Sequence, residues 1–191
     1  MNESDANSTR TNSAFNFSPV RTRKAWCLSA LFVWLFNVTH ALALTQGIYT
    51  YTTNAMGQAT ITHVSSSCSG AVIIPNAFGG CPVTCIGDEA FANCTGLTSV
   101  TISASVTSIG FAAFVNCPRL GDVTIPASVT SIGELAFLAC DGLTNINVDS
   151  ENLCYRSVDG VLFDWIQDVL IRFPSGRAGS YAIPAGVTSV C

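Results

Sequence analysis

The stretch Val106-Thr107-Ser108-Ile109-Gly110 recurs every 23 residues in a chain of 191 residues. Its other copies begin at Val83 and Val129, and each copy is followed at fixed distances by an Ala-Phe pair, a cysteine and a leucine. The aromatic and cysteine positions are Phe91, Phe114, Phe137, Cys94, Cys117 and Cys140. A fixed period of this length is typical of a solenoid, in which each repeat forms one coil stacked on its neighbour. The repeat therefore predicts an architecture much more directly than an activity.

Each repeat contains a strand with one apolar side and one polar side. Leu97, Val100 and Ile102 form an apolar strip, whereas Ser99 and Thr101 lie between them and should face solvent. One coil cannot bury its apolar residues alone, so stacked coils are expected to share one continuous core. Across the three repeats, the outward positions form a predicted polar ladder of Ser99, Thr101, Asp122, Thr124, Asn145 and Asn147.

The second half of each repeat is predicted to turn sharply. We interpret Gly110 as a residue that lets the chain turn where a side chain would cost strain. The segment Ala112-Ala113-Phe114 predicts one short helical turn with Phe114 pointing into the core. Together with its equivalents, Phe114 belongs to the expected structural core.

Eight cysteines follow residue 43, and they allow two interpretations. Cys94, Cys117 and Cys140 occupy one repeat position, and their side chains would point in the same direction, which is poor disulfide geometry. A ladder of buried thiols is therefore favoured over disulfides for these three, because free cysteine packs well as a small apolar residue. A bridge from Cys68 to Cys81 or Cys85 is the most plausible disulfide.

Changes in composition divide the chain into six segments. These are a disordered polar leader (1–20), a signal peptide or signal anchor (21–43), a β-hairpin capping coil (44–82), three repeats (83–148), a β-hairpin insert (149–180) and the truncated start of a further repeat (181–191). The insert is expected to turn at Asp159-Gly160, a dipeptide that suits a type I′ turn.

Residues 21–43 have the composition of a secretory signal. A basic patch ending at Lys24 precedes an apolar run over residues 25–38, and Ala41-Leu42-Ala43 supplies small residues where a signal peptidase cleaves. Cleavage would leave Leu44 as the first residue, although an uncleaved signal anchor in the membrane is the alternative. Either outcome predicts a secreted protein or one at the cell surface or envelope.

Composition argues against several classes of function. Only 10% of residues are charged, and the formal net charge is −4, so nucleic acid is a poor partner. After residue 43 the chain has a single histidine, His63, which is interpreted as a solvent-facing residue of a hairpin because no acidic residue lies near it in sequence. A zinc site formed by His63, Cys68, Cys81 and Cys85 is a minor alternative. We therefore predict no enzyme activity, no cofactor and no metal.

The repeat resembles the BspA-like leucine-rich repeat family. The residues that carry the resemblance are Leu97-Thr98-Ser99-Val100-Thr101-Ile102, Val106-Thr107-Ser108-Ile109-Gly110, Ala113-Phe114 and Cys117. The resemblance spans about residues 47–191. It implies a β-rich solenoid at the bacterial surface or outside the cell, and it implies adhesion to host matrix proteins or other cells for some members.

Two surfaces are candidates for ligand binding. The first is the polar ladder, and the second is the insert, where Trp165 could act as an exposed anchor. The function predicted from these features is an exported, non-catalytic module that binds a protein or glycan in adhesion or recognition. The alternative is a structural or non-functional fragment of a larger envelope-associated repeat protein.

Overall fold

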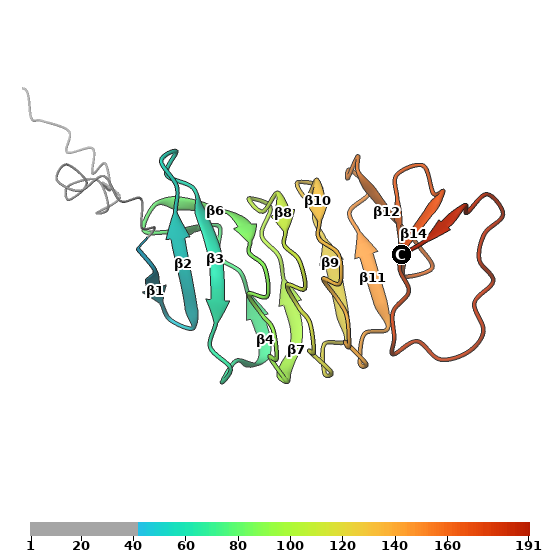
Figure 1. The fold of residues 1–191 in the computed structure, drawn as a ribbon, viewed down its shortest axis with the longest axis horizontal. Helices are drawn as coiled ribbons and strands as arrows, with labels where there is room; N and C mark the ends of the chain where they lie inside the picture. The colour runs from blue at the N-terminus through green and yellow to red at the C-terminus, as the bar shows by residue number, and fades with distance from the viewer. Residues whose placement is uncertain (1–41) are drawn as a thin grey trace, which may run out of the picture.

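The computed structural model describes residues 42–191, and this part of the chain is a solenoid of stacked coils (Figure 1). The expected signal segment at 21–43 lies almost entirely outside the described residues, as does the polar leader. The strands are β1 (Leu44–Gln46), β2 (Tyr49–Thr53), β3 (Ala59–Val64), β4 (Ser69–Ile73), β5 (Ala77–Phe78), β6 (Cys81–Ile86), β7 (Gly96–Thr101), β8 (Ser108–Ile109), β9 (Asp122–Ile125), β10 (Ser131–Ile132), β11 (Asn145–Val148), β12 (Tyr155–Val158), β13 (Val161–Asp164), β14 (Val169–Arg172) and β15 (Ser189–Val190). Within this part of the chain, no helix is both long and apolar enough to cross a membrane.

Each coil contributes one strand to each of two sheets. One sheet has the order β1-β2-β3-β6-β8-β10, and the other has the order β11-β9-β7-β4. The pairs between repeats are parallel, because successive coils run in the same direction. The solenoid therefore presents two parallel ladders with the apolar core between them (Figure 1).

The phenylalanine of each repeat lies in the core. Phe91, Phe114 and Phe137 are at most 2% exposed. The ring centroids of Phe91 and Phe114 are 4.8 Å apart, and those of Phe114 and Phe137 are 5.5 Å apart. Because Phe114 stacks on a ring at each side, it joins the apolar cores of three successive coils.

The predicted short helical turns are wrong. No residue of the described chain is helical, and Ala112 and Asn116 have left-handed φ values of 49° and 56°. These φ values turn alternate N–H groups away from their own coil, so Ala112, Phe114 and Asn116 donate to carbonyl oxygens of the next coil at 2.8–2.9 Å. A helix needs backbone hydrogen bonds between residues of its own segment. In this protein these N–H groups bond to the next coil instead.

A side chain at Gly110 would cost strain, as the sequence predicts, but the cause is not a left-handed backbone, since the φ of Gly110 is not positive. A Cβ on Gly110 would lie 2.7 Å from the carbonyl carbon of Gly87, and a Cβ on Gly133 would lie 2.5 Å from that of Gly110. The glycine N–H groups donate to the preceding coil at 2.7–2.8 Å. Glycine is required here because neighbouring backbones approach too closely for any side chain.

The insert does not project from the solenoid but packs against its last coil. The hairpin of β12 and β13 turns at Asp159-Gly160, where both φ values are positive, at 50° and 77°. Ile146 N–H donates to the carbonyl oxygen of Gly160, and Ser157 Oγ donates to the carbonyl oxygen of Ile146. The strand β14 then pairs with both β13 and β15, so the insert becomes part of a separate four-stranded sheet.

Asn152 connects the last regular coil to the insert. It is fully buried, and it lies 23 residues after Val129, at the position that valine occupies in the repeats. Its amide nitrogen donates to the carbonyl oxygens of Pro126 and Val129, while its side-chain oxygen accepts from the N–H groups of Cys154 and Tyr155. The 23-residue spacing therefore continues past Val148. At Asn152 it is kept by hydrogen bonds to the previous coil, whereas the apolar pattern has ended.

Candidate binding surface

The predicted polar ladder lies on the outer side of the sheet formed by β4, β7, β9 and β11. The strand register aligns Ser99, Asp122 and Asn145 in one row, and it aligns Thr101, Thr124 and Asn147 in a second row. Most of these side chains are exposed, and Ser99 and Asn145 are half-buried. We call this outer side of the four strands the polar sheet face.

Hydrogen bonds hold part of the first row in a defined position. The Oδ1 atom of Asp122 accepts from Thr144 Oγ1 and from Asn145 Nδ2, each at 3.0 Å. Asn145 Nδ2 also lies 3.2 Å from Thr144 Oγ1. The carboxylate of Asp122 is thus ordered by neighbouring side chains before any ligand arrives.

The strand β4 extends the polar sheet face by one residue in each row, which the sequence analysis missed. Ala71 pairs with Ser99, and Ile73 pairs with Thr101. Ile73 is 70% exposed, and its carbonyl oxygen accepts a hydrogen bond from the Tyr49 hydroxyl at 2.8 Å. The shared form of Val72-Ile73-Ile74-Pro75 and Val123-Thr124-Ile125-Pro126 was the available signal, because it places Ile73 at the outward position of Thr124.

Trp165 lies in the turn between β13 and β14 and is 46% exposed. The guanidinium carbon of Arg156 lies 6.0 Å from the centroid of its ring, at the distance of a cation–π contact. A hollow of about 320 Å³ is lined by Trp165, Arg156 and Val148, among others. Since Val148 is the last residue of β11, the structure brings Trp165 near one end of the polar sheet face.

The three repeat cysteines lie in the core with free thiols. Cys117 Sγ donates to the carbonyl oxygen of Phe91 at 3.2 Å, and Cys140 Sγ donates to that of Phe114 at 3.1 Å. Burial, with a hydrogen bond to Cys68, raises the pKa of the Cys94 thiol to about 12. The Cys94 thiol therefore stays protonated at neutral pH.

The predicted disulfide from Cys68 to Cys81 or Cys85 is wrong, because both Cys68 and Cys85 are free thiols. Cys68 is instead buried beside Cys94 and extends the thiol ladder by one position. The spacing of 26 residues between Cys68 and Cys94 hid this relation, since the other steps of the ladder are 23 residues.

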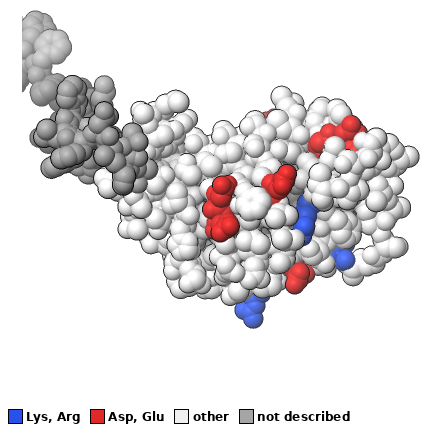
Figure 2. Space-filling model, in the orientation of Figure 1, with Lys and Arg blue, Asp and Glu red and all other residues white. Residues whose placement is uncertain are grey.

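The features considered for catalysis and metal binding lie apart. His63 is exposed on β3, where it pairs with Thr50 of the neighbouring strand. Among residues 42–191, no group of three or more His, Cys, Asp or Glu side chains is arranged to hold a metal ion. Charged side chains are sparse on the surface shown in Figure 2, with acidic groups in small separate patches. What this geometry offers chemically is a non-covalent contact surface.

Comparisons with known proteins agree with the repeat geometry. The family model described as the BspA type leucine rich repeat region matches residues 82–158, with six copies. No curated protein matches the chain.

Several solved structures are similar to the chain. A leucine rich cell surface protein from Faecalibacterium prausnitzii A2-165 is 24% identical, with a TM-score of 0.39, over 78% of this chain and 66% of that chain. The pneumococcal vaccine antigen PcpA is 18% identical, with a TM-score of 0.39, over 80% of this chain and 61% of that chain. A leucine-rich repeat protein from Bacteroides capillosus ATCC 29799 is 26% identical, with a TM-score of 0.45, over 56% of this chain and 99% of that chain. The chain thus covers less than two thirds of the length of the Faecalibacterium prausnitzii protein and of PcpA.

The matched residues 82–158 contain β7 to β12, nearly all of β6, and all three copies of the 23-residue block. The in-register strands, the stacked phenylalanines and the close glycine contacts repeat through the same region. Residues 82–158 therefore form a leucine-rich repeat region of the BspA type.

Proposed function

We propose that this protein is an exported, non-catalytic recognition module that binds a protein or glycan through the polar sheet face. The surface would act in adhesion or recognition at the cell surface, the envelope or the surrounding matrix. Export is supported by the composition of residues 21–43, with basic, apolar and small-residue regions in the order of a secretory signal.

The observation that carries the proposal is the alignment of polar side chains across parallel strands. Thr101, Thr124 and Asn147 repeat at the spacing of neighbouring strands, about 4.8 Å. A rigid sheet holds these hydroxyl and amide groups in position, so binding loses little conformational entropy. Such an array offers both donors and acceptors to a partner that has polar groups at a similar spacing.

The ends of the polar sheet face provide apolar contact area. Ile73 is exposed on β4 at one edge, and Trp165 lies near the end of β11 at the other. Large side chains of this kind often contribute most of the energy of an interface, while surrounding polar residues provide complementarity. The arrangement therefore fits a partner that spans the four strands.

Arginine substitutions on the polar sheet face test the proposal. The purified protein is applied to arrays of extracellular matrix proteins and cell-surface glycans, and its best ligand is then measured by surface plasmon resonance. The double variant Thr101→Arg/Thr124→Arg should weaken binding at least tenfold, because two long cations would cover the second row. Thr130→Arg places an arginine on an exposed threonine directly before β10, away from the polar sheet face, and should leave binding unchanged.

Two results would overturn the proposal. One is equal binding by the double variant and the wild-type protein, which would exclude the polar sheet face as the site. The other is the absence of any ligand on the arrays, which would favour a structural role within a larger envelope-associated protein.

A further inference from the structure

A polar hollow lies where the end of β11 meets the insert, and its volume is about 320 Å³. Its walls include Asp149 and Ser150 directly after β11, Arg156 and Ser157 on β12, and Trp165 in the turn between β13 and β14. Sites for small ligands begin at about 300 Å³. The hollow therefore has the size of a site for one small ligand, or for one unit of a larger ligand.

Two opposite charges line this hollow without neutralising each other. Arg156 and Asp149 form no ion pair, with each other or with any other side chain of residues 42–191. The Arg156 guanidinium instead lies over the Trp165 ring, with its carbon 6.0 Å from the ring centroid. The Oδ1 atom of Asp149 accepts from the Glu151 N–H at 2.9 Å. The guanidinium keeps its donors and the carboxylate keeps further lone pairs for a molecule in the hollow.

The balance of charge in the hollow favours a neutral ligand. An anionic ligand would approach the carboxylate of Asp149, and a cationic ligand would approach the guanidinium of Arg156, and like charges repel at close range. A neutral ligand that both donates and accepts hydrogen bonds satisfies both groups. Unpaired charges in a site thus discriminate between ligands as well as bind them.

The remaining lining adds an apolar surface and further polar groups. The Trp165 side chain is 46% exposed, so its flat ring is accessible for packing against an apolar face of a ligand. Ser157 Oγ donates its hydrogen to the carbonyl oxygen of Ile146 at 2.7 Å and remains an acceptor. The Ser150 hydroxyl is exposed on the opposite segment. One apolar face and several polar groups therefore surround the same space.

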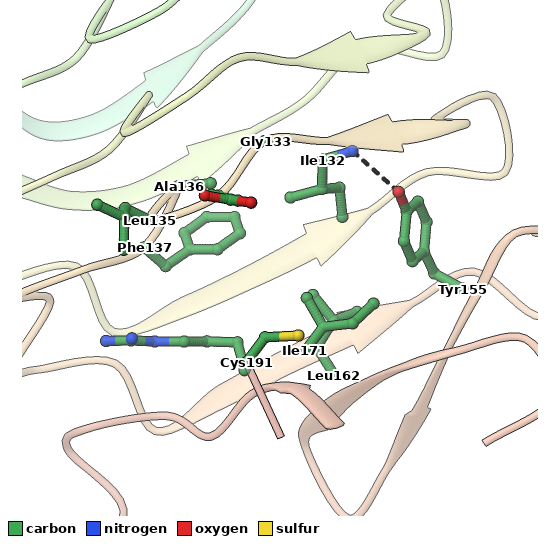
Figure 3. A pocket seen from close by; sticks show the side chains of 11 residues that line it. Ile132, Gly133, Leu135, Ala136, Phe137, Tyr155, Leu162, Ile171 and Cys191 are labelled. Carbon is green, nitrogen blue, oxygen red and sulfur yellow. Dashed lines mark hydrogen bonds between the residues drawn. The ribbon is translucent and has the colours of Figure 1, made fainter. Parts of the chain in front are cut away.

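The walls of the hollow are held in place by contacts outside it. The Tyr155 hydroxyl accepts a hydrogen bond from the Ile132 N–H at 2.9 Å, which joins β12 to β10 (Figure 3). Arg156 follows Tyr155 directly on this strand. The N–H of Trp165 donates to the carbonyl oxygen of Cys154 at 3.0 Å. Because the walls are fixed in advance, binding loses little conformational entropy.

We propose that the hollow binds one neutral hexopyranose unit of a glycan. The C–H face of the sugar ring packs on Trp165, while its hydroxyl groups accept from Arg156 and donate to Asp149. A pyranose has hydroxyl groups around its rim for four polar side chains, whereas a neutral peptide side chain offers one amide or hydroxyl group. The inference rests on the proposed function, in which a glycan is one of the two partner classes, and it names the sugar class at one end of the polar sheet face.

Nuclear magnetic resonance tests the site with single sugars. The probes are the methyl glycosides of glucose, galactose and mannose, added to the ¹⁵N-labelled full chain. At least one of them should shift the indole N–H resonance of Trp165, which the spectrum of Trp165→Phe identifies by its absence. The same sugar should give a saturation-transfer signal at its ring C–H protons, with a dissociation constant in the millimolar range.

Protein variants locate the contact through the saturation-transfer signal of the sugar. Trp165→Ala should weaken binding at least tenfold, and Trp165→Phe should recover most of the loss because a flat ring is retained. Ile166→Ala is the matched control, since Ile166 is 72% exposed next to Trp165 but does not line the hollow, and binding should be unchanged. Thermal unfolding of each variant checks that it is folded.

Three results would overturn the inference. The first is that none of the three glycosides shifts the Trp165 resonance, and the second is equal sugar binding by Trp165→Ala and the wild-type protein. The third is at least tenfold tighter binding of glucuronic acid, glucosamine or acetyl-asparagine amide, which would assign the hollow to a charged ligand or a peptide side chain.

The polar sheet face is tested separately by the variant Thr101→Arg/Thr124→Arg, which should bind the single sugar as the wild-type protein does. Loss of array binding in that variant, without any sugar in the hollow, would leave the polar sheet face supported and the hollow excluded. Failure of the hollow and failure of the proposed function are therefore distinguishable.

Discussion

At the scale of single residues, contacts with a neighbouring coil decide which amino acid certain positions can hold. Gly110 and Asn152 are the clearest cases. The first must have no side chain, because the backbone of the previous coil lies against it. The second must be polar although it is buried, because four backbone groups converge on its amide. Each leads to a prediction about stability.

Gly110→Ala should destabilise the protein by about 1–3 kcal/mol, the usual cost of overpacking. The added Cβ would lie 2.6 Å from the backbone nitrogen of Asp88 and 2.7 Å from the carbonyl carbon of Gly87. Gly121→Ala is the matched control, because its Cβ would meet nothing nearer than 3.7 Å, and it should be neutral or slightly stabilising. Urea unfolding monitored by circular dichroism measures both. Equal stabilities for the two variants would contradict the close-contact explanation.

Asn152→Leu should lower the free energy of unfolding by about 2–4 kcal/mol, although leucine has a similar size. The substitution leaves the carbonyl oxygens of Pro126 and Val129 and the N–H groups of Cys154 and Tyr155 without their partner, and such buried groups cost about 1–3 kcal/mol each when unsatisfied. The same unfolding assay applies. A stabilised variant would mean that water or a local shift replaces the amide.

At the scale of elements, each coil is stable because it repeats the contacts of the one before it. Stacked phenylalanines, thiols that donate to the preceding coil and alternate N–H donors all cross the same interfaces. Contacts of this kind make the stability of a solenoid depend on nearest-neighbour interfaces. Changes at a central coil should therefore act on two interfaces at once.

Phe114→Ala should destabilise the protein by about 3–5 kcal/mol, the range for truncating a buried aromatic residue. Phe114 packs between Phe91 and Phe137, so its removal leaves a cavity that opens to both neighbouring coils. Phe111→Ala serves as a control because Phe111 is 43% exposed, and its effect should be well below that of Phe114→Ala. Differential scanning calorimetry of the two variants distinguishes the cases. A near-neutral Phe114→Ala would be incompatible with its place in the core.

The thiol ladder predicts a loss of stability at high pH. A buried thiol whose pKa is raised stabilises the fold fully below the pKa of the unfolded cysteine, about 8.5, and loses that contribution as the pH rises towards the folded value. For Cys94 the folded pKa is about 12, so the loss should develop between these two values. The Tm measured from pH 8 to pH 11 should fall less steeply for Cys94→Ala than for the wild-type protein. If Tm fell equally steeply with pH in the variant and in the wild-type protein, the raised pKa of Cys94 would be contradicted.

At the scale of the whole molecule, a regular solenoid ends in a region that departs from the repeat. The insert covers the end of β11 and pairs with β15. The regular part provides the polar sheet face. This surface depends on the number and register of the stacked coils.

Low charge should make the proposed recognition insensitive to salt. Only 10% of residues are charged, and the polar sheet face has one carboxylate in its two rows, on Asp122. Binding that relies on neutral hydroxyl and amide groups should change less than threefold between 50 and 500 mM NaCl, since screening acts mainly on charge pairs. Surface plasmon resonance with the array ligand measures this. A change of tenfold or more would point to a charged contact outside the two rows.

Much of this molecule could be predicted from sequence because its repeat copies share the same apolar, glycine and cysteine positions. Three in-phase blocks were sufficient to predict the solenoid and to separate inward residues from outward ones such as Thr101 and Thr124. The failures occurred where a residue depends on another coil. The helical turn at Ala112 was predicted from local composition, but hydrogen bonds to the next coil decide its conformation.

By itself, the sequence determined the period, the apolar positions and hence the family of the fold, because these follow from the spacing of residues along the chain. Only the tertiary structure decided why Gly110 is glycine and that Cys68 joins the thiol ladder. The physical reason is distance. Close backbone contact and thiol hydrogen bonding are relations between residues more than 20 positions apart, and they exist only once the coils stack.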